Sequence, residues 1–279
     1  MLFQSYIFIL LFFPLCLLGF WGLKRRKLLQ LWLIAFSLWF YGAASPYYLL
    51  LLLGSIAWNY AFFRTIERGI GRVTERVFGS AMERAEYGME RDSSRKRLLL
   101  GIGIAGNLAL LCFFKYFNAI SAGWSQMKGL EDPILQLALP LGISFFTFQQ
   151  IGFLADAYKG EVGACSLREY VLFVSFFPYV SSGPIVNAQE MLPQYRQIGR
   201  QRLDWAKFAG GLYLFALGLS KKVLLADTFG KAVDAGYGNV AGLSGTDAWL
   251  VMLFYPLQLY FDFSGYCDMA VGLGKMIGL

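Results

Sequence analysis

Long uncharged blocks of hydrophobic residues fill the first part of the chain. The first block, residues 5–23, carries no Asp, Glu, Lys or Arg and ends at the basic cluster 24–27. The second block, residues 28–63, is charge-free for longer than one bilayer crossing needs, and Ser45-Pro46 is a turn signal inside it. Because a transmembrane helix takes about 20 apolar residues, this pattern predicts one helix over the first block and two short helices over the second.

Further apolar segments follow, and two of them are interrupted. They cover residues 98–114, 134–155, 170–186, 208–226 and 248–279. Pro140 and Gly142 break the second of these segments, and Pro178 breaks the third. We expect residues 119–133 to form a short external loop. No repeat or linker divides the chain, so the pattern predicts an all-α, polytopic transmembrane helical bundle with residues 1–279 in a single membrane domain.

The charges between the apolar segments predict a topology. Lys and Arg gather on the cytoplasmic side of membrane proteins, so the basic cluster 24–27 places the N-terminus outside. Strict alternation would then place residues 187–207 outside, although they include four basic residues against two acidic ones. The simplest solution is that one of the two interrupted segments is re-entrant, which requires protein or a water-filled cavity around it.

The one long polar stretch, residues 64–97, mixes nine basic with six acidic residues. Arg64, Arg68, Arg72 and Arg76 recur every four residues and therefore share one side of a helix. One interpretation is an amphipathic helix on the anionic cytoplasmic leaflet. The other is a solvated cytoplasmic loop with helical turns, and both place the stretch inside the cell.

Composition supports a membrane protein and argues against other classes. Hydrophobic residues make up 57% of the chain and charged residues 15%, against about 25% charged in soluble proteins. The net charge of +7 follows the positive-inside rule in short loops and does not indicate nucleic-acid binding. The four cysteines lack metal-site spacing, so we expect neither a metal site nor a disulfide framework. We do not expect the first block to be a cleaved signal peptide, because its positive charge follows the apolar run.

Two rows of polar residues run through the last apolar segment. On a helix the rows lie about 200° apart, and they consist of Gln258, Asp262 and Tyr266, and of Tyr260, Ser264 and Asp268. An aspartate at membrane depth costs about 2.5–3.5 kcal/mol on insertion scales, so both must be paired, hydrogen-bonded or hydrated. This helix is therefore predicted to be central, where each row either lines a substrate channel or ties neighbouring helices together.

A second polar seam lies in the interrupted segment around residues 140–161. Ser144, Thr147 and Gln150 fall roughly along one side of a helix there. A functional and a structural explanation are equally good for this seam.

Four stretches, taken in order, match the pattern of a known family. They are residues 141–161, 176–194, 218–227 and 257–279, of which LQLYFDFSGYCDMAVGLGKMIGL (257–279) is the most specific. Together they resemble the membrane-bound O-acyltransferase (MBOAT) family, in its bacterial polysaccharide O-acetylase branch. The start, MLFQSYIFILLFFP, is also similar. The resemblance covers the whole chain, and it adds Gln149, Gln150 and Asn187 to the two polar rows as candidate tunnel-lining residues.

The resemblance implies a helical fold around a tunnel in the bacterial inner membrane. An acetyl group would pass from a cytoplasmic donor, acetyl-CoA or another acyl thioester, to a hydroxyl of an extracytoplasmic polysaccharide such as alginate. Family members often hand the group on through a partner transfer protein. The resemblance implies no bound cofactor, and the remaining partner is membrane lipid.

One part of the family pattern is missing from the sequence. The family's catalytic histidine lies in an Arg-Trp-His motif beyond the stretch that resembles residues 257–279, and this chain contains no histidine. Asp262 and Asp268 are poor substitutes, because ionised carboxylates are weak bases unless their pKa is strongly perturbed. We therefore expect an N-terminal portion of an acyltransferase that does not turn over by itself.

Two other functions compete with the acyltransferase. In an ion-coupled transporter, intramembrane Asp262 and Asp268 would bind or relay cations. An inverted repeat would favour that function, and the sequence shows none. In a non-catalytic membrane scaffold, the chain would recruit envelope enzymes.

Overall fold

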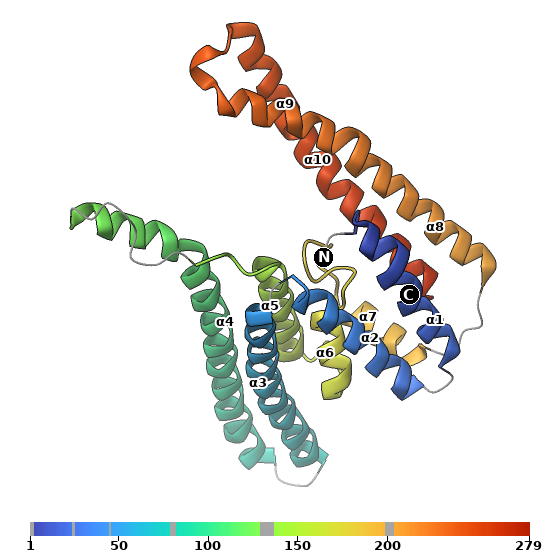
Figure 1. Cartoon of the computed structure of the whole chain (residues 1–279). Helices are drawn as coiled ribbons and strands as arrows, with labels where there is room; N and C mark the ends of the chain where they lie inside the picture. Colours follow the sequence, from blue (N-terminus) through green and yellow to red (C-terminus); the bar gives the residue numbers. More distant parts are fainter. Residues whose placement is uncertain (1–2, 24–25, 45, 79–81, 129–136, 199–203) are drawn as a thin grey trace. The chain divides into compact units, whose positions relative to one another are not determined.

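The protein is helical throughout the part of the chain that the structure describes. This computed structural model describes residues 3–23, 26–44, 46–78, 82–128, 137–198 and 204–279, without the side chains of residues 26 and 68–93. Within these ranges the elements are helices joined by turns and extended connections, without a β-strand (Figure 1). The predicted all-α class is therefore confirmed.

Several of the described helices are apolar enough for a membrane. Three helical stretches have the length and hydropathy of a bilayer crossing, namely Pro46–Glu67, Ser94–Met127 and Trp205–Gly238. Two shorter apolar helical stretches, Phe8–Gly22 and Lys27–Gly42, accompany them. These helices confirm the prediction of a multi-pass membrane protein, whereas re-entry of an interrupted segment stays a prediction.

The chain folds as two compact units. The first unit comprises residues 1–36, 182–184 and 196–279, and the second comprises residues 37–181 and 185–195. Helix α2 (Arg26–Gly42) begins in the first unit and ends in the second. The units are described one at a time below, and a single membrane domain stays a prediction.

The first unit is built on one long antiparallel helix pair. Helix α8 (Trp205–Ser220), the π-helix η2 (Lys221–Ala226) and α9 (Asp227–Gly238) follow one another without a break and pack along α10 (Gly245–Met276). The short 3₁₀-helix η3 (Val240–Gly242) lies in the turn between α9 and α10, and η1 (Phe8–Phe12) continues into α1 (Phe13–Gly22). A capping box starts α10, because Ser244 Oγ accepts from the Asp247 backbone nitrogen and the Asp247 carboxylate accepts from that of Ser244.

The second unit surrounds α5 with three other helices. Its elements are α3 (Pro46–Phe78), α4 (Met82–Met127), α5 (Ile143–Lys159), α6 (Leu167–Ser175) and α7 (Ala188–Gln197), whose last two residues belong to the first unit. Helix α5 packs against α3, α4 and α6. Aromatic rings fill this core: the Phe153 ring centroid lies 4.7 Å from that of Tyr170 and 5.1 Å from that of Phe63.

The predicted external loop over residues 119–133 is wrong in its first part. Helix α4 continues to Met127, and residues 129–136 lie outside the described residues. The prediction ended the helix near Lys115, but a lysine at the end of an apolar run can extend its side chain towards water while the helix continues. The cation of Lys115 lies 5.9 Å from the Tyr116 ring centroid, and the following residues contain no proline before Met127.

The breaks predicted from proline and glycine are present. Helix α5 begins only at Ile143, after Gly142 at φ 67°, where a Cβ would collide with the backbone oxygens of Val180 and Ser181. Helix α6 ends at Ser175, and turns follow it. In the polar stretch 64–97 the backbone is helical to Phe78 and again from Met82. Its predicted amphipathic face lies mostly outside the described side chains.

Candidate functional site

Two adjacent lysines occupy the middle of the long helical stretch in the first unit. Lys221 and Lys222 open η2, and π-helical turns inside α-helices are rare and frequent at functional sites. Lys221 Nζ donates to Asp268 Oδ2 at 2.6 Å and to Ser264 Oγ at 3.0 Å. Lys221 therefore binds one of the two polar rows predicted on α10.

The second lysine binds the other row. Lys222 Nζ lies 2.7 Å from Asp262 Oδ1 and 2.8 Å from Asp227 Oδ1. Because the rows lie about 200° apart on α10, the two lysine side chains reach two different sides of that helix. The helix carrying both polar rows is thus paired with cations on both sides.

Glycines let the backbones of α8 and α10 approach each other closely beside the two lysines. A Cβ on Gly265 would lie 2.7 Å from Gly218 O and 3.2 Å from Lys222 N. Seven residues later on α10 and seven residues earlier on α8, a Cβ on Gly272 would lie 2.6 Å from Gly211 O. Such glycine contacts are typical of closely packed transmembrane helices. They fix the register in which the lysines meet the carboxylates.

The charges of this cluster nearly cancel. Two ammonium groups face three carboxylates, so the cluster carries a net charge of about −1 when all five groups are ionised. The Lys221 and Asp268 side chains are each 26% exposed, whereas Asp262 is 51% exposed. Pairing offsets the cost of intramembrane charges. These contacts support the structural explanation, in which Asp262 and Asp268 tie neighbouring helices together, and their role in a channel wall stays a prediction.

The other predicted residues of α10 are in varied surroundings. Gln258 packs at Gly230, where a Cβ would lie 3.0 Å from Gln258 Nε2. Its buried Oε1 has no hydrogen-bond partner within the described residues. The Tyr266 ring stacks on Phe3 at 4.9 Å, and Tyr260 is 63% exposed. The structure thus brings the two aspartates and Ser264 to one charged cluster and leaves Tyr260 outside it.

The lysines are the site residues that the sequence analysis missed. A signal was present, because two consecutive lysines interrupt the apolar run of residues 208–226. Intramembrane charges of opposite sign on two predicted helices are expected to pair. The register that pairs them depends on the glycine contacts between α8 and α10, which the sequence does not reveal.

The two predicted glutamines in the second unit connect α5 to its neighbours. Gln150 Nε2 donates to Ser55 Oγ at 2.9 Å, and Gln150 Oε1 accepts from the Tyr170 hydroxyl at 3.2 Å. Gln149 Nε2 donates to Phe173 O at 3.0 Å. Both glutamines are buried, and their contacts support the structural explanation of this polar seam.

Two other polar groups near the seam differ from each other. Thr147 is fully buried, and its Oγ1 has no hydrogen-bond partner among the residues that the structure describes. Asn187 is exposed and lies at the start of α7, where its carbonyl oxygen accepts from Met191 N at 3.1 Å. Within the described residues, no hydrogen bond joins the Asn187 side chain to the glutamines of α5.

A buried tyrosine pair was not predicted. The Tyr179 and Tyr195 hydroxyl oxygens lie 2.8 Å apart, and Tyr179 also donates to Phe173 O at 2.6 Å. Burial raises the pKa of the Tyr195 hydroxyl well above its usual value, and the nearby Tyr179 hydroxyl raises it further. The hydroxyl is therefore neutral at physiological pH and acts as a hydrogen-bonding group.

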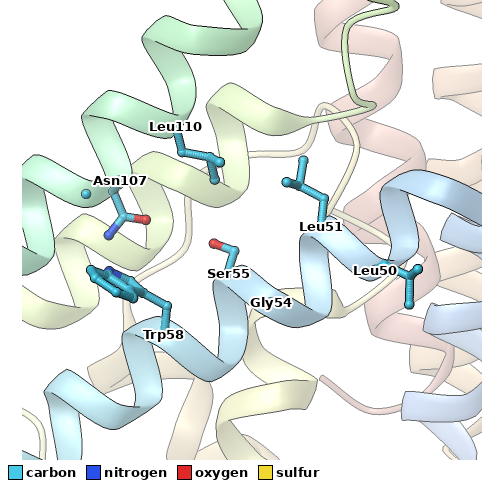
Figure 2. Close-up of a pocket in the computed structure, with 8 residues that line it drawn as sticks. Leu50, Leu51, Gly54, Ser55, Trp58, Asn107 and Leu110 are labelled. Carbon is cyan, nitrogen blue, oxygen red and sulfur yellow. The ribbon is translucent and has the colours of Figure 1, made fainter.

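A cavity of about 410 Å³ lies between α3 and α4. Figure 2 shows Ser55 and Trp58 on one helix and Asn107 and Leu110 on the other. The polar side chains of the cavity, Ser55 and Asn107, already have hydrogen-bond partners within the protein. Asn107 exchanges hydrogen bonds with buried Asn59 at 2.6 and 3.0 Å, and Ser55 accepts from Gln150. No ionisable group is among its described lining residues, so the cavity offers an apolar wall and no acid–base chemistry.

Comparison with known proteins gives one family and several relatives. Residues 95–279 match the family "MBOAT, membrane-bound O-acyltransferase". The whole chain aligns at 36% identity with 54% of a "Peptidoglycan O-acetyltransferase" of Helicobacter pylori. It also aligns in full, at 35% identity, with 53% of a "Probable alginate O-acetylase" of Pseudomonas putida. Half of the chain aligns, at 27% identity, with 36% of the length of a "Teichoic acid D-alanyltransferase" of Lacticaseibacillus rhamnosus.

The extent of these matches confirms the resemblance found in the sequence. The chain spans about half the length of the two O-acetylating relatives. The family match includes the charged cluster of η2 and α10 and the polar seam of α5. The chain belongs to the membrane-bound O-acyltransferase (MBOAT) family.

Proposed function

We propose that the protein forms the membrane core of an O-acetyltransferase that modifies an extracytoplasmic polysaccharide. The observation that carries this proposal is the alignment of the whole chain with two relatives whose names both describe O-acetylation. The donor would be acetyl-CoA or another cytoplasmic acyl thioester. The acceptor would be a hydroxyl of a polymer such as peptidoglycan or alginate outside the inner membrane, reached directly or through a transfer protein.

The reaction needs a base that this chain does not contain. The acceptor oxygen attacks the thioester carbonyl, the new C–O bond forms, and the C–S bond breaks as the thiol leaves. A general base takes the proton of the hydroxyl and passes it to the departing sulfur, and histidine suits that role at neutral pH. The chain has no histidine, and Asp262 and Asp268 are each already engaged in an ion pair with a lysine. The 279 residues alone should therefore not turn over.

The charged cluster would have a supporting role in this function. It holds α10 against the long α8–η2–α9 stretch, and α10 carries the most specific stretch of the family resemblance. The same pairing does not support the transporter alternative, because each aspartate already has a lysine as its cation. The scaffold alternative stays open to the test below.

Acetyl transfer in inverted membrane vesicles tests the proposal. The vesicles contain this chain alone, the unmatched second half of the Helicobacter pylori relative alone, or both together, and receive acetyl-CoA labelled in the acetyl group. The acceptor polysaccharide is enclosed in the vesicle lumen, which corresponds to the extracytoplasmic side. We expect labelled ester in peptidoglycan, alginate or another enclosed polysaccharide only when both are present. Transfer by the chain alone would refute the predicted inactivity. If the combination transfers to no acceptor while the intact relative does, the scaffold becomes the better explanation.

A further inference from the structure

Three consecutive basic residues stand at the start of a membrane-crossing stretch in the second unit. Arg95, Lys96 and Arg97 lie in the first turn of Ser94–Met127, the stretch of α4 (Figure 1) that has the hydropathy of a bilayer crossing. No carboxylate of the described residues forms an ion pair with any of the three. At the end of the apolar stretch Pro46–Glu67 of α3, by contrast, Arg64 Nη1 lies 2.6 Å from Glu67 Oε2.

A groove leads from these cations along α4. It has a volume of about 570 Å³ and is lined by Ser94, Arg97, Leu98, Gly101, Ile102 and Ala105. These residues recur at three- and four-residue spacing, so they lie on one face of the helix. A Cβ added to Gly101 would meet no atom within 4 Å. The groove is thus open at its centre, polar and cationic at one end and apolar over the rest.

The dimensions of the groove match one leaflet of a bilayer. Ser94 and Ala105 are eleven residues apart, which is about 16 Å along a helix axis. That length is about half of the 30 Å hydrocarbon core. Ser94 and Arg97 occupy the first part of this length, and the apolar path over residues 98–105 spans about 10 Å. A polar end next to an apolar path has the same arrangement as a phospholipid, with its phosphate at the interface and an acyl chain below it.

We propose that this groove binds an anionic phospholipid of the cytoplasmic leaflet. Arg97 and Ser94 contact the headgroup phosphate, and an acyl chain lies over Leu98, Gly101 and Ile102. The charge favours an anionic lipid over a zwitterionic one, because three cations that have no carboxylate partner among the described side chains are attracted to negative charge. The apolar path favours a lipid over a soluble anion, and Leu98 and Ile102 are exposed on the surface that the bilayer covers.

Native mass spectrometry of the full 279-residue chain tests the site. The protein is purified from vesicles of equimolar phosphatidylglycerol and phosphatidylcholine with identical acyl chains, and the retained lipids are counted. We expect phosphatidylglycerol to be retained in preference to phosphatidylcholine. Arg97→Gln should lower that preference about fivefold, which corresponds to one basic residue near an anionic surface. Equal retention of the two lipids by the native protein would overturn the proposal.

A glycine pair provides the matched control. Gly101→Leu fills the groove and should reduce retention of both lipids, whereas Gly123→Leu on the same helix should leave it unchanged, because a Cβ there also meets no atom within 4 Å. Circular dichroism confirms that each variant is folded. Equal lipid retention by the two leucine variants would contradict the site. Displacement of the lipid by soluble glycerol phosphate would instead assign the cations to a soluble anion, and a dimer lost only in Gly101→Leu would assign the groove to a second copy.

Discussion

Substitution of Gly265 by alanine should separate the two helices that carry the charged cluster. The new Cβ would lie 2.7 Å from Gly218 O, whereas ordinary contact begins at 3.4 Å, so the backbones must move apart by about 0.7 Å, the difference between these distances. The two nearest atoms, Gly218 O and Lys222 N, belong to the backbone and cannot move aside by a side-chain rotation. Overpacking of this kind costs about 1–3 kcal/mol. The lysine–carboxylate contacts of η2 should lengthen at the same time.

The matched control lies on the same helix. At Gly274 the nearest atoms to a new Cβ belong to Leu279, 4.0 Å away, so Gly274→Ala should be neutral or gain about 0.5–1 kcal/mol from the loss of glycine flexibility. The free energy of unfolding of each variant is measured in bicelles by titration with SDS. Equal stability of Gly265→Ala and Gly274→Ala would refute the close approach of α8 and α10.

Three further substitutions test other contacts. Lys222→Met should lower the free energy of unfolding by about 1–3 kcal/mol, a value between those of exposed and buried ion pairs. Adding Asp262→Asn should restore part of this loss in the same SDS titration. Asn107→Leu leaves the Oδ1 of buried Asn59 without its donor, although Asn59 Nδ2 keeps Ser55 O, and should lower the free energy of unfolding by about 1–3 kcal/mol; the double variant Asn107→Leu with Asn59→Leu should be more stable than Asn107→Leu alone, which a thermal melt in detergent measures. Gly142→Ala should cost more than about 1 kcal/mol, because φ is 67° and the backbone is crowded there; an unchanged melting temperature would contradict this.

The sequence predicted the positions of the helices better than it predicted the contacts of their polar side chains. The apolar segments read from hydropathy and length overlap the bilayer-crossing stretches Pro46–Glu67, Ser94–Met127 and Trp205–Gly238, and Pro178 and Gly142 mark breaks that the structure contains. The end of α4 was misplaced, because a lysine can lie at an interface without ending a helix. These features depend on local chemistry, which a single sequence displays directly.

The partners of the polar residues depend on tertiary contacts. The helical period predicted that Asp262 and Asp268 lie on different sides of α10, and each indeed has a different lysine. Which cation each aspartate meets follows from the glycine contacts between α8 and α10, which involve residues more than 45 positions apart. The same limit applies to Gln150, whose partners Ser55 and Tyr170 come from two other helices.

Exchange of one ion pair tests most directly whether lysines of η2 hold α10 in place. Lys221→Asp and Asp268→Lys each bring two like charges together, and each should lower the free energy of unfolding in bicelles by about 1–3 kcal/mol. The double variant restores opposite charges across the 2.6 Å contact, so it should regain at least half of the summed loss. Losses that simply add in the double variant would show that the two side chains do not interact.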